Sequence, residues 1–239
     1  MAKLGASAPL PVYERALRKA CKAAPPPYGQ AEYGELYREA ATDAEWLAIS
    51  LVTNAEREGD GATRLWSLAA STEDRITAAQ LKGHAIDESN HSKMYLRLAD
   101  LVFPDAIEPK FREQLKDLSP GYTRAMEPAA KEGSPFSHAI SLDDLIQMNI
   151  AEIRTTIHHL LQRPMLLEHC AADRRDKVVR VLDCLLRDEV EHVAYTARLI
   201  EACAASVGPD AVKRLFAERL QDFNDVTRAE LQRQVFDVS

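Results

Sequence analysis

Glycine is scarce in this sequence, and no segment is apolar over a long run. Only 9 of the 239 residues are glycine, whereas alanine, leucine, arginine and glutamate, which favour helices, are abundant. No stretch of about 18 residues is apolar throughout, so we expect no membrane-spanning helix. The N-terminus also lacks the apolar core of a signal peptide. These features predict a helical, cytoplasmic protein that is long enough for one domain with a substantial core.

The sequence also lacks an excess of basic residues and any paired cysteines. Its formal net charge is -7 at pH 7, which disfavours nucleic acid as a partner. The 4 cysteines form no Cys-x-x-Cys motif, which argues against a zinc site or a rubredoxin-type iron site. They are expected to be reduced thiols. We therefore expect neither nucleic acid nor a membrane among the partners of this protein.

Two short signatures stand out, each with a glutamate and a histidine three positions apart. They are Glu88-x-x-His91 and Glu189-x-x-His192. On a helix, residues three apart lie about 60° apart on one face, so each signature directs a carboxylate and an imidazole at the same point. Two such pairs, in separate amphipathic segments, predict a dimetal site in a helical bundle. In such a site, two further helices each supply one more glutamate.

The hydrophobic pattern predicts four long helices and one extra C-terminal helix. The expected ranges are 31–58, 71–101, 141–164, 173–205 and 209–236, after an N-terminal arm at 1–30 with a possible short helix at 12–23. The turn Gly59-Asp60-Gly61 is expected to end the first long helix, and Pro164 to interrupt or end the third. Residues 104–140 are a proline-rich connection with one short helix near 111–118. Such a long connection between the second and third helices is typical of a ferritin-like bundle.

Two further glutamates complete the predicted ligand set. Glu152 lies in the middle of a core-like helix, and a buried carboxylate is costly unless it is paired or binds a metal. Glu45 lies on an apolar stripe, although it could instead be a capping partner of Thr42. Glu56 is the rival of Glu45 on the same stripe, closer to the expected glycine turn. We therefore predict Glu45 and Glu152 as metal ligands, with Glu56 as the alternative to Glu45.

The metal ions are predicted from the chemistry of these donors. Hard carboxylates suit oxidised iron or manganese, and neutral imidazoles suit the ferrous state. We therefore expect two iron ions, with manganese as the alternative. Asp87 and Asp188 directly precede the signatures, and each is expected to accept a hydrogen bond from the ligating histidine of the other signature. A solvated surface position is the alternative for both aspartates.

With these motifs, residues 40–205 resemble the ferritin-like di-iron carboxylate superfamily. The Asp-Glu-x-x-His signatures are similar to those of ribonucleotide reductase small subunits, acyl-carrier-protein desaturases and bacterial multicomponent monooxygenases. The resemblance implies an all-α fold: a ferritin-like four-helix bundle at residues 31–239, with a long crossover between helices 2 and 3 and an extra C-terminal helix. It also implies that Thr156, one turn after Glu152, is a catalytic residue in an oxygen-activation pocket. An ordinary helix residue is the alternative for Thr156.

Tyr95 and His84 are two further positions at which the sequence can be compared with this superfamily. Tyr95 corresponds to the radical tyrosine of the reductase small subunits, but we interpret it as a core residue because the rest of that longer chain is missing. His84 shares a face with Glu88 and is included as a seventh metal ligand. Arylamine N-oxygenases carry an extra ligating histidine on the other signature helix, where this chain has Leu185. A role for His84 in contacting a ligand or the substrate therefore stays open.

The function predicted from this resemblance is that of an O2-dependent di-iron oxidoreductase, similar to a monooxygenase. O2 is the expected co-substrate, and hydroxylation or N-oxygenation of a small organic molecule is the expected reaction. Electrons would come from an external donor, and a homodimer is left open. One alternative is a ferroxidase or peroxide-scavenging protein of the ferritin–rubrerythrin type. Another is a helical structural or partner-binding protein whose acidic residues are ordinary surface groups.

Overall fold

The structure is a computed structural model, and it describes residues 9–232. Within this range every regular element is helical and none is a strand, which confirms the predicted all-α class. The α-helices are α1 Pro11–Ala23, α2 Ala31–Ala40, α3 Ala44–Ser71, α4 Arg75–Val102, α5 Pro109–Leu115, α6 Leu142–His169, α7 Arg175–Val207 and α8 Pro209–Gln232. Two 3-10 turns, η1 Pro27–Gly29 and η2 Lys116–Leu118, complete the set. None of the described helices is long and apolar enough to cross a membrane.

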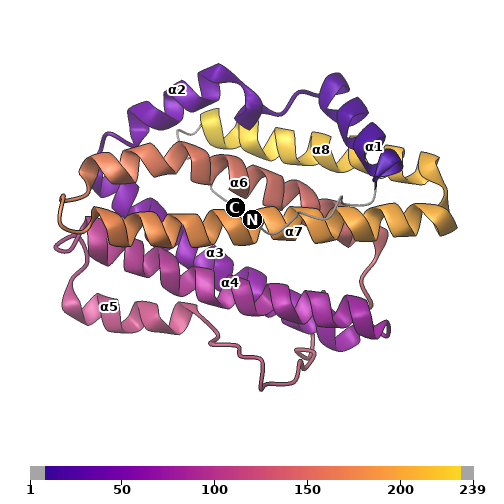
Figure 1. Cartoon of the computed structure of the whole chain (residues 1–239), viewed down its shortest axis with the longest axis horizontal. Coiled ribbons are helices and arrows are strands. Elements are labelled where there is room, and N and C mark those ends of the chain that lie inside the picture. Colours follow the sequence, from indigo (N-terminus) through magenta and orange to yellow (C-terminus); the bar gives the residue numbers. More distant parts are fainter. Residues whose placement is uncertain (1–8, 233–239) are drawn as a thin grey trace, which may run out of the picture.

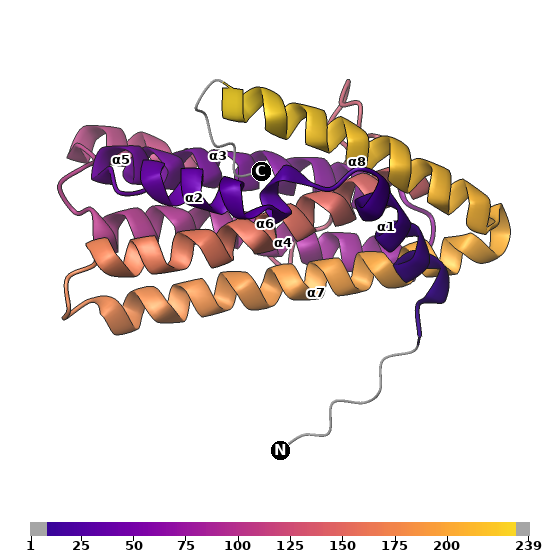
Figure 2. The same cartoon turned by 90° about the horizontal axis from the view of Figure 1, so that it is seen from above.

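Four long helices lie alongside one another in two hairpins (Figures 1 and 2). Helix α3 packs along α4, α6 packs along α7, and the hairpins meet where α4 contacts α7. Helices α3 and α4 are 28 residues each, and α7 has 33, so each spans more than about 40 Å. Figure 1 shows α1, α2 and α8 on the α6 side of this array and α5 on the α4 side.

Polar residues define where three of the long helices begin. Asp43 accepts hydrogen bonds from the backbone N–H groups of the first turn of α3, and Asp74 does the same for α4. Ser141 and Asp144 form a reciprocal capping box at the start of α6. Each cap satisfies backbone donors that the helix itself leaves unpaired. The helix starts near Ser71 and Ser141 that the sequence predicts are therefore correct to within a few residues.

The predicted glycine turn at the end of the first long helix is wrong. Helix α3 runs through Gly59 to Ser71, and α2 is a separate helix that ends at Ala40. Gly59 is required by a close approach: a Cβ built on it would lie 1.9 Å from the backbone oxygen of Leu118. Gly59 therefore makes room for the segment after α5 instead of stopping the helix.

Pro164 also lies inside its helix, since α6 continues to His169. A proline removes the hydrogen bond to the carbonyl four residues earlier, which here belongs to Leu160. The Leu160 side chain is 55% exposed, so its turn of the helix faces solvent. Water can therefore solvate this carbonyl, and the helix continues past the proline.

The long connection between α4 and α6 was predicted and is present at residues 103–141. Its predicted short helix near 111–118 corresponds to α5 and η2. Ser119 donates a hydrogen bond to the backbone oxygen of Ser89 at 2.6 Å, and Ser89 Oγ accepts one from the backbone N–H of Tyr122 at 3.0 Å. These contacts attach the connection to α4 beside the first signature.

The described part of the N-terminal arm packs against the long helices. The predicted short helix at 12–23 is present as α1, and its Tyr13 is buried against Phe216 of α8. Glu201 of α7 accepts hydrogen bonds from the backbone N–H groups of Val12 and Tyr13, and so caps α1. The extra C-terminal helix is also present as α8, while its expected end near Phe236 lies outside the described residues.

Candidate metal centre

Two groups of carboxylate and imidazole side chains meet between the four long helices. One group is Glu58, Glu88, His91 and Glu189, and the other is His84, Glu88, Glu152 and His192. In each group, one potential ligand atom from every residue lies within 4.8 Å of the others. Helix α3 supplies one of these residues, α4 three, α6 one and α7 two. Because Glu88 belongs to both groups, the two groups adjoin each other and could hold metal ions.

Glu88 and Glu189 lie between the two signature histidines. The Oε1 atom of Glu189 is 3.3 Å from Nδ1 of His91, and its Oε2 atom is 3.5 Å from Nδ1 of His192. The Oε1 atom of Glu88 is 3.8 Å from the first Nδ1 and 3.3 Å from the second. Both carboxylates therefore lie within 3.8 Å of a histidine from each group.

Several polar atoms of this centre are buried without a hydrogen bond. They are Nδ1 of His91, Nδ1 of His192 and both carboxylate oxygens of Glu189, considering residues 9–232. Buried polar atoms are normally hydrogen-bonded, because leaving them unpaired costs free energy. These atoms lie close together, with the two Glu189 oxygens 3.3 and 3.5 Å from the two Nδ1 atoms, and a metal ion between them would accept their lone pairs. The donor set therefore fits metal ions.

The aspartates that precede the signatures contact the histidines in the predicted crossed arrangement. Nε2 of His91 lies 3.5 Å from Oδ2 of Asp188, and Nε2 of His192 lies 3.4 Å from Oδ2 of Asp87. With the proton on Nε2, each histidine keeps its Nδ1 lone pair for the centre. Although burial opposes it, hydrogen bonds from His91 and Arg187 lower the pKa of Asp188 to about 2.

His84 is brought into the second group, as the sequence interpretation allowed. Its Nε2 atom lies 2.8 Å from Glu88 Oε1 and 3.1 Å from Glu152 Oε1, and its Nδ1 atom lies 2.7 Å from the hydroxyl of Tyr195. That hydroxyl donates to the sulfur of Met148 at 3.3 Å. The tyrosine oxygen is then free to accept from Nδ1–H, so that loss of the Nε2 proton would make the Nε2 lone pair of His84 available to a metal ion.

The pKa values of the carboxylates in the centre are shifted in opposite directions. Burial and the nearby Glu88 raise the pKa of Glu58 well above its ordinary value, and burial raises that of Glu152. Although burial opposes it, hydrogen bonds from Glu58 and His84 lower the pKa of Glu88 to about 2. Like charges this close cannot all ionise. Binding of divalent cations would displace the remaining protons and compensate the negative charge.

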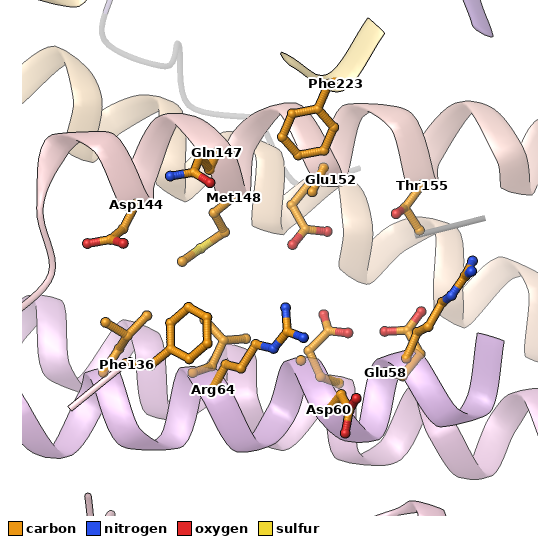
Figure 3. Close-up of a pocket in the computed structure, with 16 residues that line it drawn as sticks. Glu58, Asp60, Arg64, Phe136, Asp144, Gln147, Met148, Glu152, Thr155 and Phe223 are labelled. Atoms are coloured by element: carbon orange, nitrogen blue, oxygen red, sulfur yellow. The ribbon is translucent and has the colours of Figure 1, made fainter. Parts of the chain in front are cut away.

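A cavity of about 410 Å³ adjoins the centre between α3 and α6 (Figure 3). Glu58, Glu88 and Glu152 form part of its wall. The remaining lining residues are Arg57, Asp60, Gly61, Arg64, Leu65, Leu68, Phe136, Asp144, Gln147, Met148, Ala151, Thr155 and Phe223. The volume is in the range of pockets that bind small molecules. The centre is therefore accessible to a small organic ligand.

The predicted α3 ligand needs correction. Glu45 lies exposed in the first turn of α3, where its N–H donates to the capping Asp43, and it belongs to neither group. Glu56, the alternative, is also exposed. The α3 residue in the centre is Glu58, which lies about 20 Å further along the helix than Glu45. The sequence interpretation missed it because Glu58 stood at the supposed end of the helix, next to Gly59.

The predicted catalytic residue Thr156 is also placed differently. Its hydroxyl donates to the backbone oxygen of Glu152 at 2.8 Å, and it does not line the cavity. The cavity follows the α6 stripe of Met148, Glu152 and Thr155, so Thr155 is the threonine at the cavity wall. Tyr95 is buried in the core, as expected, with its hydroxyl 3.3 Å from Nε2 of His159.

Comparison with known proteins finds no matching family model, no matching curated protein and no matching solved structure. A function for this chain must therefore be inferred from its own side chains.

Proposed function

We propose that this protein is a ferritin-like di-iron oxidoreductase that uses O2 to oxidise a small organic substrate. One observation supports it most strongly. The two oxygens of Glu189 face the Nδ1 atoms of two different histidines, His91 and His192, at 3.3 and 3.5 Å. A carboxylate placed in this way suits a bridge between two ions rather than a single mononuclear site. The long connection between the second and third long helices also agrees with a ferritin-like bundle.

Glu88 and Glu189 would be shared by the two proposed ions, and each ion would also be held by residues of its own. Glu58 and His91 would hold one ion, and Glu152, His192 and His84 would hold the other. Four carboxylates balance two divalent cations, and a mixture of carboxylates with imidazoles suits iron, with manganese as the alternative. When bound, the ion pair supplies redox chemistry with O2 that amino-acid side chains lack.

The surrounding side chains orient the ligands and shape the space for a substrate. Asp87 and Asp188 hold the two signature histidines in the tautomer that presents Nδ1. Leu65, Leu68 and Met148 make part of the cavity wall apolar, which limits water near the reacting atoms. Thr155 offers a hydroxyl at the same wall, three residues after Glu152, and could hold a proton close to a bound ligand. Electrons would come from an external donor.

The alternative function is that of a ferroxidase or peroxide scavenger, which oxidises iron or reduces peroxide without an organic substrate. The cavity favours the oxygenase, because an iron-storage site does not need 410 Å³ of partly apolar space beside its ligands. The two functions are separable by measuring O2 consumption by the iron-loaded protein, with a chemical reductant, in the presence and absence of small organic compounds.

We expect O2 consumption that depends on an organic compound, together with an oxidised product that contains oxygen from O2. The variant Glu189→Ala should abolish both, whereas Glu45→Ala should leave both unchanged. Rapid O2 consumption driven by iron(II) alone, with no effect of any organic compound, would support the ferroxidase instead. Equal activity of Glu189→Ala and wild type would refute the proposed site.

A further inference from the structure

The cavity beside the candidate metal centre is lined by a positively charged side chain, Arg64, as well as by carboxylates. Figure 3 shows Glu58 towards one end of the cavity and Phe136 and Asp144 towards the other, with the guanidinium of Arg64 between them and opposite Glu152. Arg64 follows Glu58 by six residues on α3, a rise of about 9 Å along the helix axis. A molecule that reaches the carboxylates can therefore contact Arg64 as well.

The two aspartates that line the cavity, Asp144 and Asp60, form no ion pair with Arg64 among the described residues. Asp144 accepts hydrogen bonds from the N–H and hydroxyl of Ser141 and lies 3.0 Å from Nε2 of His138, so its charge is already engaged. Asp60 is exposed, and in Figure 3 its carboxylate points away from the space between α3 and α6. Among residues 9–232, no carboxylate forms an ion pair with Arg64.

Arg64 is nevertheless held in a defined place. Its guanidinium lies 5.3 Å from the ring centroid of Phe136, a cation–π contact. Figure 3 shows the guanidinium extending into the space between α3 and α6. A guanidinium that stacks on a ring keeps its N–H groups at the edge available, and these match the two oxygens of a carboxylate.

From this geometry we propose that the cavity selects a small organic acid. Arg64 binds the carboxylate of the acid, the apolar wall packs against its body, and its far end lies beside the candidate metal centre. This inference rests on the proposed function, since it names the class of substrate that the centre would oxidise.

The experiment compares three compounds of similar size and different charge by isothermal titration calorimetry. They are benzoate, the neutral benzamide and the cationic benzylammonium ion, each titrated into the purified full-length protein with its metal content measured. We expect benzoate to bind at least about tenfold more tightly than benzamide, and benzylammonium to bind most weakly. A charge-assisted pair with arginine provides a difference of this size.

Three variants assign the preference to one side chain. Arg64→Gln should remove the preference for benzoate, and Arg64→Lys should restore part of it. Arg75→Gln, which changes an exposed arginine at the start of α4, should leave it unchanged. Arg64 is itself exposed, so its variants should fold normally, and circular dichroism would verify this.

Four results would overturn the inference. They are equal affinities for benzoate and benzamide, tighter binding of benzylammonium, no saturable binding of any of the three at millimolar concentration, and a benzoate preference that survives in Arg64→Gln. The last result would mean that benzoate coordinates a metal ion without help from Arg64.

The experiments distinguish a failure of this inference from a failure of the proposed function. A protein that binds two iron ions but shows no preference for acids disproves this inference alone. A protein that prefers benzoate through Arg64 but binds no iron disproves the proposed function alone.

Discussion

Replacing Glu58 by alanine should lower metal binding and remove the stabilisation that one of the two proposed ions gives to the fold. Glu58 is a terminal ligand of one proposed ion, so Glu58→Ala should reduce the metal content from about two ions per chain to about one. Loss of even an outer hydrogen-bond partner of a ligand costs about 10–100-fold in metal affinity. Loss of the ligand itself should cost at least as much.

The loss of stability should be larger in the metal-loaded protein than in the metal-free protein. In the metal-free protein, burial and Glu88 raise the pKa of Glu58, so this carboxylate is an unfavourable member of the cluster. Alanine relieves this repulsion, but it also removes the hydrogen bond from Glu58 to Glu88 and leaves a cavity, so the metal-free protein should not gain stability. In the loaded protein, each ion present at about 100 times its Kd stabilises the fold by about 2.7 kcal/mol. For a chain of this size, losing one ion should lower Tm by about 5–10 °C.

The assay is metal analysis by mass spectrometry together with thermal unfolding of metal-free and iron(II)-loaded protein. Glu45→Ala is the matched control, because Glu45 is an exposed glutamate of the same helix outside both groups. It should keep about two ions per chain and the full metal-dependent rise in Tm. Equal metal content in the two variants, or a deficit in Glu45→Ala alone, would show that the assignment of Glu58 is wrong.

Three further substitutions test other parts of the structure. Gly59→Ala places a Cβ 1.9 Å from the Leu118 oxygen and should destabilise the fold by about 1–3 kcal/mol in thermal unfolding. Gly61→Ala is the control: a Cβ there meets nothing within 4 Å, and the change should be neutral or stabilise the fold by up to about 1 kcal/mol. Tyr195→Phe removes the partner of His84 Nδ1 and should weaken binding of one ion by about 10–100-fold in a chelator competition, unlike Tyr13→Phe. Thr155→Val should lower the yield of product per O2, whereas Thr156→Val should not, because only Thr155 lines the cavity.

Most of the centre was predictable from local spacing along single helices. Three residues apart on a helix is a short-range relation, so Glu88 with His91 and Glu189 with His192 could be paired without knowing the fold. The crossed contacts of Asp87 and Asp188 followed from the need of a ligating histidine for an acceptor. These predictions depended only on helices that the sequence pattern located correctly.

The errors arose where tertiary contacts override a local signal. Glycine often ends a helix, but Gly59 lies inside α3 and makes room for the backbone carbonyl of Leu118, which is distant in sequence. Because Gly59 was interpreted as a helix stop, Glu58 was not considered, and Glu45 was predicted as the α3 ligand. The α3 residue of the candidate centre is Glu58. Thr156 was predicted at the pocket because it lies one turn after Glu152, but Thr155 lines the cavity, because the direction of the cavity along α6 depends on how α3 packs against it. Neither relation is encoded in a single helix.

An anaerobic titration of the metal-free protein with iron(II) tests the central claim most directly. The account predicts binding that saturates at about two ions per chain, and Mössbauer spectra after exposure to O2 that show two coupled ferric ions. Saturation at one ion per chain, or two ions with the spectra of isolated ferric sites, would contradict a dinuclear centre bridged by Glu88 and Glu189.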